Sequence, residues 1–110
     1  MRQIPLFLLL TACGPSPVAV CAGNHSGTFD GSDIGTMTGT LDEKGKAKIT
    51  LVGEASGELS NSGSVDNDGT MTLSGLVAVE GVLDLETCAS SGTWDQSLAG
   101  LSGTWEMSLD

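Results

Sequence analysis

The stretch SGTWDQSLAGLSGTWEMSL, residues 91–109, contains the same four-residue phrase twice, on either side of a short segment. Each phrase places a serine, a glycine and a threonine before a tryptophan, which is Trp94 in the first copy and Trp105 in the second. After the second copy, apolar and polar residues alternate as far as Leu109. An alternation with a period of two is typical of a strand with one buried face. The stretch therefore predicts an antiparallel hairpin that turns near residues 99–100.

The same opening phrase, a glycine and a threonine before a large apolar residue, recurs along the chain. It begins at Gly27, Gly35, Gly39 and Gly69, and GTMT occurs twice. Threonine is a good strand former on an exposed face, and the large residue next to it points to the opposite face. Since alternation also runs through residues 46–51 and 70–79, we expect strands over most of the chain.

Residues 42–45 and 66–69 have the composition of hairpin turns, and the dipeptides at 62–63, 80–81, 91–92 and 99–100 indicate further turns or bulges. We expect strands near residues 24–32, 35–42, 46–54, 57–66, 69–79, 81–88, 91–98 and 101–109. The order predicts an all-β, antiparallel up-and-down meander of about eight short strands that closes into a small β-barrel. A β-sandwich is the alternative. Closure is favoured because it removes exposed strand edges.

The chain is strongly acidic, with 4 basic residues against 14 carboxylates and a formal net charge of −10. This balance argues against a nucleic-acid partner, because phosphate binding needs clustered lysine and arginine. The three lysines, Lys44, Lys46 and Lys48, alternate along one turn and strand start. We interpret them as a solvated strand face, and the acidity as a source of solubility.

The amino terminus reads as a targeting segment. Arg2 supplies one positive charge, and residues 4–12 are almost wholly apolar but too short to span a bilayer, which takes about 20 residues. Leu10-Thr11-Ala12-Cys13 resembles the bacterial lipobox. The resemblance implies that the Cys13 thiol receives diacylglycerol, that a signal peptidase cuts before Cys13, and that its new amino group is acylated, for example with palmitate. The alternative is a chance apolar terminus with an ordinary disulfide cysteine.

This resemblance divides the chain into a signal peptide at 1–12, a lipidated amino terminus and tether at 13–22, and a β-domain at 23–110. It implies a lipid-anchored protein of the bacterial cell envelope, whose partners are the membrane and another envelope protein. Gly14 after the cysteine favours the outer membrane over the inner one.

With Cys13 assigned to lipid, Cys21 and Cys88 remain as a pair in an oxidising compartment. A disulfide between them would close a loop of about 67 residues, worth about 4 kcal/mol. The alternative is two free thiols or a redox pair, but the cysteines lack the Cys-x-x-Cys spacing that is usual for redox catalysis.

Few residues suggest chemistry. His25 is the only histidine, and in a strand it would point away from Ser26, which argues against a catalytic triad with Asp30. The acidic pair Asp66 and Asp68 fits a turn better than a calcium loop, although a weak Ca²⁺ site at these two residues is the alternative. We expect no other metal, no cofactor and no enzymatic activity.

Trp94 and Trp105 are expected to be core residues first and a stacking surface for a ligand second. The glycine-threonine meander is similar to those of uncharacterised bacterial lipoproteins and of the lipoprotein barrels of the transferrin-receptor-associated kind; no functional residue can be transferred from these. The sequence thus predicts a non-catalytic, lipid-anchored structural or protein-interaction module. The alternative is a lipocalin-like barrel that binds a small ligand near the two tryptophans.

Overall fold

The computed structural model describes residues 17–110, so the predicted signal peptide, Cys13 and the residues just after it lie outside the described residues. The described chain begins with a 3-10 helix, η3 (Pro17–Cys21). Eight strands follow it, namely β1 (Gly23–Gly31), β2 (Gly35–Leu41), β3 (Lys46–Gly53), β4 (Gly57–Val65), β5 (Thr70–Gly75), β6 (Ala78–Leu83), β7 (Ala89–Gln96) and β8 (Leu101–Leu109).

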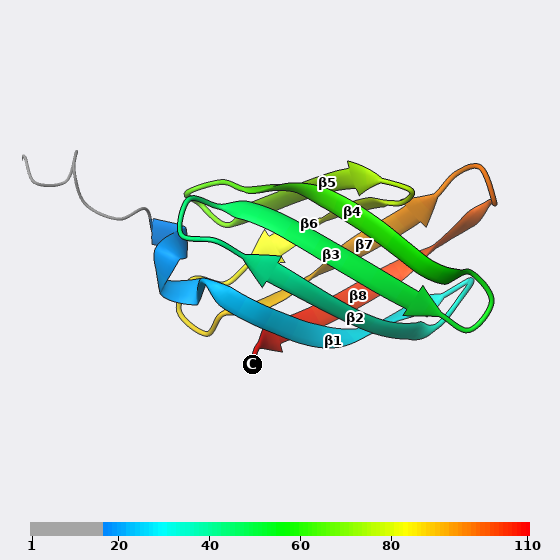
Figure 1. Ribbon diagram of the computed structural model, residues 1–110, viewed down its shortest axis with the longest axis horizontal. Coiled ribbons are helices and arrows are strands. Elements are labelled where there is room, and N and C mark those ends of the chain that lie inside the picture. Colours follow the sequence, from blue (N-terminus) through cyan, green and yellow to red (C-terminus); the bar gives the residue numbers. More distant parts are fainter. Residues whose placement is uncertain (1–16) are drawn as a thin grey trace, which may run out of the picture.

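The strands form one closed antiparallel barrel in sequence order, β1 to β8 (Figure 1). Closure comes from the pairing of β1 with β8, which sets His25 opposite Leu109 and Gly31 opposite Gly103. This confirms the predicted up-and-down meander and selects the barrel over the sandwich. Successive loops alternate between the two ends of the barrel. We call one end, formed by loops 32–34, 54–56, 76–77 and 97–100, the distal end, because η3 lies at the other end (Figure 1).

The period of two in the sequence separates the interior of the barrel from its wall. On β2, for example, Met37 and Leu41 are buried, whereas Thr36, Thr38 and Thr40 are exposed. The interior of an eight-stranded barrel is just wide enough for side chains to fill. The barrel core consists of Phe29, Met37, Leu41, Ala47, Ile49, Leu51, Leu59, Val65, Met71, Leu73, Val77, Val79, Leu83, Trp94, Trp105 and Met107.

The single strand expected over residues 69–79 is wrong. The chain turns at residues 76–77, and β5 and β6 pair so that Leu73 lies opposite Val79. Both of these side chains point inward. The alternation of apolar and polar residues therefore continues through the turn, and the sequence pattern gives no sign of the turn. The turn is stabilised by Asn61, whose side-chain Oδ1 accepts a hydrogen bond from the backbone N–H of Val77 at 2.8 Å.

The strand expected over residues 81–88 is also wrong, because β6 ends at Leu83. The side chain of Asp84 ends it by accepting hydrogen bonds from the backbone N–H groups of Glu86 and Thr87, which is an Asx-type turn. The following backbone N–H, that of Cys88, donates to the carbonyl oxygen of Asp84 at 2.7 Å.

Three of the dipeptides predicted to be turns or bulges, at residues 62–63, 80–81 and 91–92, lie inside strands whose register is unbroken. Their glycines are needed where neighbouring backbones approach closely. A Cβ atom on Gly63 would lie 2.0 Å from the carbonyl oxygen of Thr72, and one on Gly92 would lie 1.9 Å from that of Glu80. Glycines of this kind allow the strong local bending that a small barrel needs. The turn predicted at residues 99–100 is confirmed.

Part of the segment predicted as lipidated amino terminus and tether, residues 13–22, belongs to the fold. Pro17–Cys21 form η3, and the side chains of Val18 and Cys21 are completely buried in the barrel core. Val18 closes one end of the barrel beside the turn at Gly45. Residues 17–21 are therefore part of the fold. Among residues 17–110, no helix is long and apolar enough to cross a bilayer.

Candidate functional site

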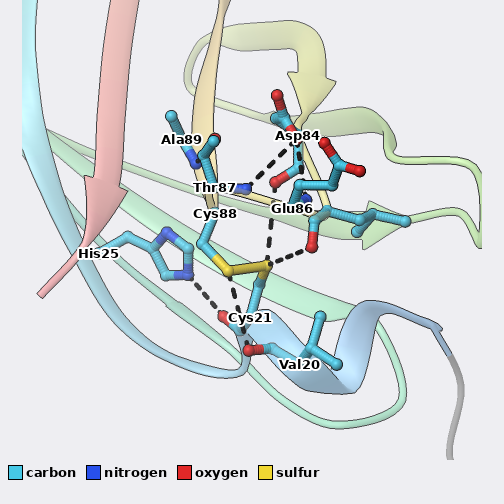
Figure 2. The surroundings of a disulfide bond; sticks show 9 residues. Val20, Cys21, His25, Asp84, Glu86, Thr87, Cys88 and Ala89 are labelled. Atoms are coloured by element: carbon cyan, nitrogen blue, oxygen red, sulfur yellow. Dashed lines mark hydrogen bonds between the residues drawn. A yellow bond between two sulfur atoms is a disulfide. The ribbon is translucent and has the colours of Figure 1, made fainter.

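The predicted disulfide between Cys21 and Cys88 is present (Figure 2). It joins η3 to the loop that follows β6 and closes a sequence separation of 67 residues. Cys88 is the only non-glycine residue among 17–110 with a positive φ, 61°. This left-handed conformation costs an ordinary residue about 1 kcal/mol or more. The carbonyl of Cys88 also accepts a hydrogen bond from the backbone N–H of Leu109, so the loop is tied to β8 as well.

His25 belongs to the same structure. Its ring is buried, and Nε2 donates a hydrogen bond to the carbonyl oxygen of Cys21 at 2.8 Å (Figure 2). The neighbouring Ser26 points outward, as predicted, and its hydroxyl donates to the carboxylate of Asp110. The histidine and the disulfide thus both hold Cys21, the last residue of η3, against the barrel.

A cavity of about 20 Å³ remains inside the barrel at the η3 end. Its walls are mostly apolar, with His25 and Ser90 as the two buried polar residues that line it. The Ser90 hydroxyl has no hydrogen-bond partner within residues 17–110. This volume is of the order needed for one water molecule. It is far below the roughly 300–1,000 Å³ of typical small-molecule sites.

Trp94 and Trp105 are core residues, with 2% and 3% of their surface exposed. The Trp94 ring meets Phe29 edge to face at 5.3 Å, and its Nε1 donates to the carbonyl oxygen of Asp30 at 3.0 Å. The Trp105 Nε1 lies 3.1 Å and 3.0 Å from the carbonyl oxygens of Glu80 and Thr93. Neither indole lines the interior cavity. Their nitrogens donate to main-chain carbonyls of neighbouring strands, and burial of both rings places them in the barrel core.

The repeated SGTW phrase has a structural explanation. The β7–β8 register places Gly92 of the first phrase opposite Trp105 of the second, and Gly103 of the second opposite Trp94 of the first. A Cβ atom on Gly103 would lie 2.7 Å from Nε1 of Trp94, and one on Gly81 would lie 2.7 Å from the Trp105 ring. Each tryptophan therefore lies across a glycine and reaches the strand beyond it.

The acidic pair Asp66 and Asp68 forms a turn. The backbone N–H of Gly69 donates to the carbonyl oxygen of Asp66, and Oδ1 of Asp68 accepts from the backbone N–H of Thr70 at 3.0 Å. Within residues 17–110, no group of three histidine, cysteine, aspartate or glutamate side chains is placed to hold a metal ion. The alternating lysines Lys46 and Lys48 lie on the exposed face of β3.

Asp33 is a buried carboxylate that sequence reasoning missed. Its side chain joins the first two loops of the distal end. Oδ1 accepts hydrogen bonds from the backbone N–H groups of Ile34 at 2.9 Å and Ala55 at 3.1 Å. Oδ2 accepts from the backbone N–H and the hydroxyl of Ser56. A Cβ atom on Gly53 would lie 2.2 Å from Oδ2, so a glycine is required beside it. The Ser56 hydroxyl is the main cause that lowers the pKa of Asp33. The three backbone donors add to the effect, and burial opposes it.

The lowered pKa values of aspartates that accept hydrogen bonds lead us to expect a loss of stability in acid. Two exposed aspartates behave similarly. The backbone N–H of Lys46 is the main cause that lowers the pKa of Asp42, and the backbone N–H of Thr70 is the main cause that lowers the pKa of Asp68. Because folding lowers these pKa values below the ordinary 3.8, the stabilisation is complete above that pH and is lost as the pH falls through the lower folded values. We expect the urea midpoint to fall as the pH is lowered from about 5 to 2.

The matched control for this prediction is Asp33→Asn. It should lower the urea midpoint at pH 7, and the midpoint of this variant should then depend less on pH in the acid range than that of the parent protein. An acid dependence equal to that of the parent would exclude Asp33 as a source of the effect.

The described residues thus build a disulfide-linked barrel whose interior is filled by side chains apart from the cavity of about 20 Å³. Comparison of the chain with known protein families, with curated protein sequences and with solved structures finds no match.

Proposed function

We propose that this protein is a lipid-anchored module of the bacterial cell envelope, held to the membrane through Cys13, which acts by structural support or by binding another envelope protein. The proposal that the module is not catalytic is supported by the filled interior of the barrel. Its cavity of about 20 Å³ has space for roughly one water molecule, so a partner would have to bind on the outside. The anchor itself rests on the lipobox Leu10-Thr11-Ala12-Cys13.

The position of η3 gives this proposal an orientation. A fully extended chain spans at most about 3.3–3.6 Å per residue, so four residue steps from Cys13 to Pro17 span no more than about 14 Å. The η3 end would then stay close to the lipid headgroups, and the distal end would point away from the membrane (Figure 1). The disulfide and the His25 hydrogen bond would keep η3 bound to the barrel, so that only a short segment would separate the barrel from the lipid anchor.

Fractionation of a bacterial host that expresses the full chain tests the anchor. We expect the parent protein in the membrane fraction and the Cys13→Ser variant outside it, because a free chain lacks the acyl groups that stabilise the membrane-bound state by about 0.8 kcal/mol per buried methylene. Cys21→Ser is the matched control: it removes a cysteine but keeps the lipobox, so it should stay with the membranes. Recovery of the parent protein in the soluble fraction would contradict the proposal.

A small-ligand carrier is the second candidate, and the unpartnered Ser90 hydroxyl at the interior cavity is the observation that favours it. Such a carrier would need η3 to leave the barrel end, since Val18 now closes it. A hydrophobic fluorescent probe distinguishes the two candidates. A carrier should bind the probe in its interior, so that Ser90→Phe, which fills the cavity, abolishes binding. Binding of the probe to the outer surface of the filled module should be unchanged by Ser90→Phe.

A further inference from the structure

The distal end differs from the rest of the surface in its exposed apolar side chains. Of the six large exposed hydrophobic residues among 17–110, four lie at this end or directly beside it. Ile34 is 46% exposed in the first loop, Leu76 is 63% exposed in the third, and Leu98 is fully exposed at the tip of the fourth. Val52, 49% exposed, lies on β3 just before the second loop. Exposed apolar groups gathered at one place mark interaction surfaces.

The charges at this end have one sign. The exposed carboxylates near the distal loops are those of Asp30, Glu54, Glu58 and Asp95, whereas the lysines of residues 17–110 all lie on the β2–β3 hairpin at the η3 end. None of these lysines belongs to the distal loops or to the strand ends beside them, so the distal end has an excess of negative charge, and the nearest lysine is Lys48, which lines the same surface hollow as Ser60. Such an excess of negative charge favours a positively charged partner and opposes pairing with a second copy of the same end.

The distal end also has a short free strand edge. The β4–β5 register begins at Asn61 and Gly75, so residues 57–60 pair with β3 but have no strand on their other side. The backbone N–H of Val65 points to the β3 side, where it bonds to Gly45, and that of Asp66 points to the β5 side. Backbone groups alternate in direction along a strand. Those of Glu58 and Ser60 are therefore directed to the free side. Ser60 lies at the margin of this edge, since a Cβ atom on Gly75 would be 2.8 Å from its carbonyl oxygen, and Leu76 follows Gly75 in the chain.

We propose that the distal end docks an extended, basic segment of a partner protein, in which lysine or arginine alternates with apolar residues. The segment would lie along the free edge of β4, in the space left by the short β5–β6 hairpin. Its main chain would pair with Glu58 and Ser60, its apolar side chains would cover Leu76 and Leu98, and its cations would face Glu54 and Glu58. Addition of a strand to an exposed sheet edge is an established mode of peptide recognition. This proposal rests on the interaction function proposed above and names its partner.

The test uses the full chain carrying Cys13→Ser, which needs no detergent, and a synthetic peptide of eight residues that alternates lysine and valine. We expect binding that weakens with added salt. Leu76→Ser combined with Leu98→Ser, and separately Glu54→Lys combined with Glu58→Lys, should each weaken it about tenfold. A peptide with N-methylated backbone amides should also bind about tenfold more weakly. The matched controls, Val82→Ser and Glu86→Lys, change an exposed apolar and an exposed acidic residue away from the distal end, and should leave affinity unchanged.

Equal binding of an alternating glutamate and valine peptide, or weakening by the control variants, would overturn this assignment. So would the absence of binding by a protein whose circular dichroism shows that it is folded. Self-association that the double leucine variant abolishes would assign the distal end to a second copy instead, and binding of phosphatidylcholine vesicles would assign it to lipid. The membrane fractionation of the parent protein is measured separately. A negative result with the peptide would therefore not affect the test of the lipid anchor.

Discussion

Cys88→Ser is expected to lower the free energy of unfolding by about 4 kcal/mol, as measured by urea denaturation at neutral pH. The bridge to Cys21 closes a separation of 67 residues, and most of its stabilisation comes from the restriction of the unfolded chain. A small domain has a total stability of about 5–15 kcal/mol, so this loss is a large fraction of it. The first local consequence is the release of η3, which should appear as faster amide exchange near Val18 and His25.

Two controls separate the disulfide from its surroundings. The parent protein in reductant should fall to the stability of Cys88→Ser, which should itself not respond to reductant. Cys88→Gly should be about 1 kcal/mol more stable than Cys88→Ser, because glycine adopts the φ of 61° at this position without steric cost. A parent protein whose stability is unchanged by reduction would show that the bridge does not support the fold.

Trp94→Ala is expected to cost about 3–5 kcal/mol of unfolding free energy, the usual effect of truncating a buried tryptophan. The substitution would remove the edge-to-face contact with Phe29 and the hydrogen bond to the carbonyl of Asp30, and would leave a cavity over Gly103. Urea denaturation followed by circular dichroism measures the loss without relying on the fluorescence of the replaced ring.

Trp94→Phe is the conservative comparison and should cost less, since it keeps most of the buried ring and loses the N–H donor. The tryptophan emission of the parent protein should resist quenching by acrylamide, because both indoles are at most 3% exposed. A cost below about 1 kcal/mol for Trp94→Ala, or ready quenching, would indicate an accessible tryptophan and would support the carrier candidate over the filled barrel.

Most of the fold could be predicted because it depends on alternation. The period of two in residues 101–109 and 46–53 fixes which side chains enter the barrel, and the turn at residues 66–69 has a clear composition. The errors arose where local chemistry or pairing overrides that signal. The turn at 76–77 preserves the inward positions of Leu73 and Val79, and so leaves no break in the pattern. Gly92 was interpreted as part of a turn or bulge because only the register reveals that it lies opposite a tryptophan.

The site residues were predictable to a different extent. The pairing of Cys21 with Cys88 followed from counting the cysteines, and it is confirmed. The roles of His25 and Asp33 could not be predicted, since each depends on backbone groups that only the folded chain brings near: the carbonyl of Cys21 and the N–H groups of Ala55 and Ser56. The distal end is also invisible in the sequence, because its acidic and apolar residues come from separate loops and strand ends that only the barrel brings to one end.

Intact-mass analysis of the protein extracted from membranes tests the proposed anchor and the disulfide together. We predict a chain that begins at Cys13, carries a diacylglycerol and an amide-linked acyl chain, and gains two hydrogens on reduction as the Cys21–Cys88 bridge opens. A mass that corresponds to Met1–Asp110 without acyl chains would contradict the anchored, stapled barrel.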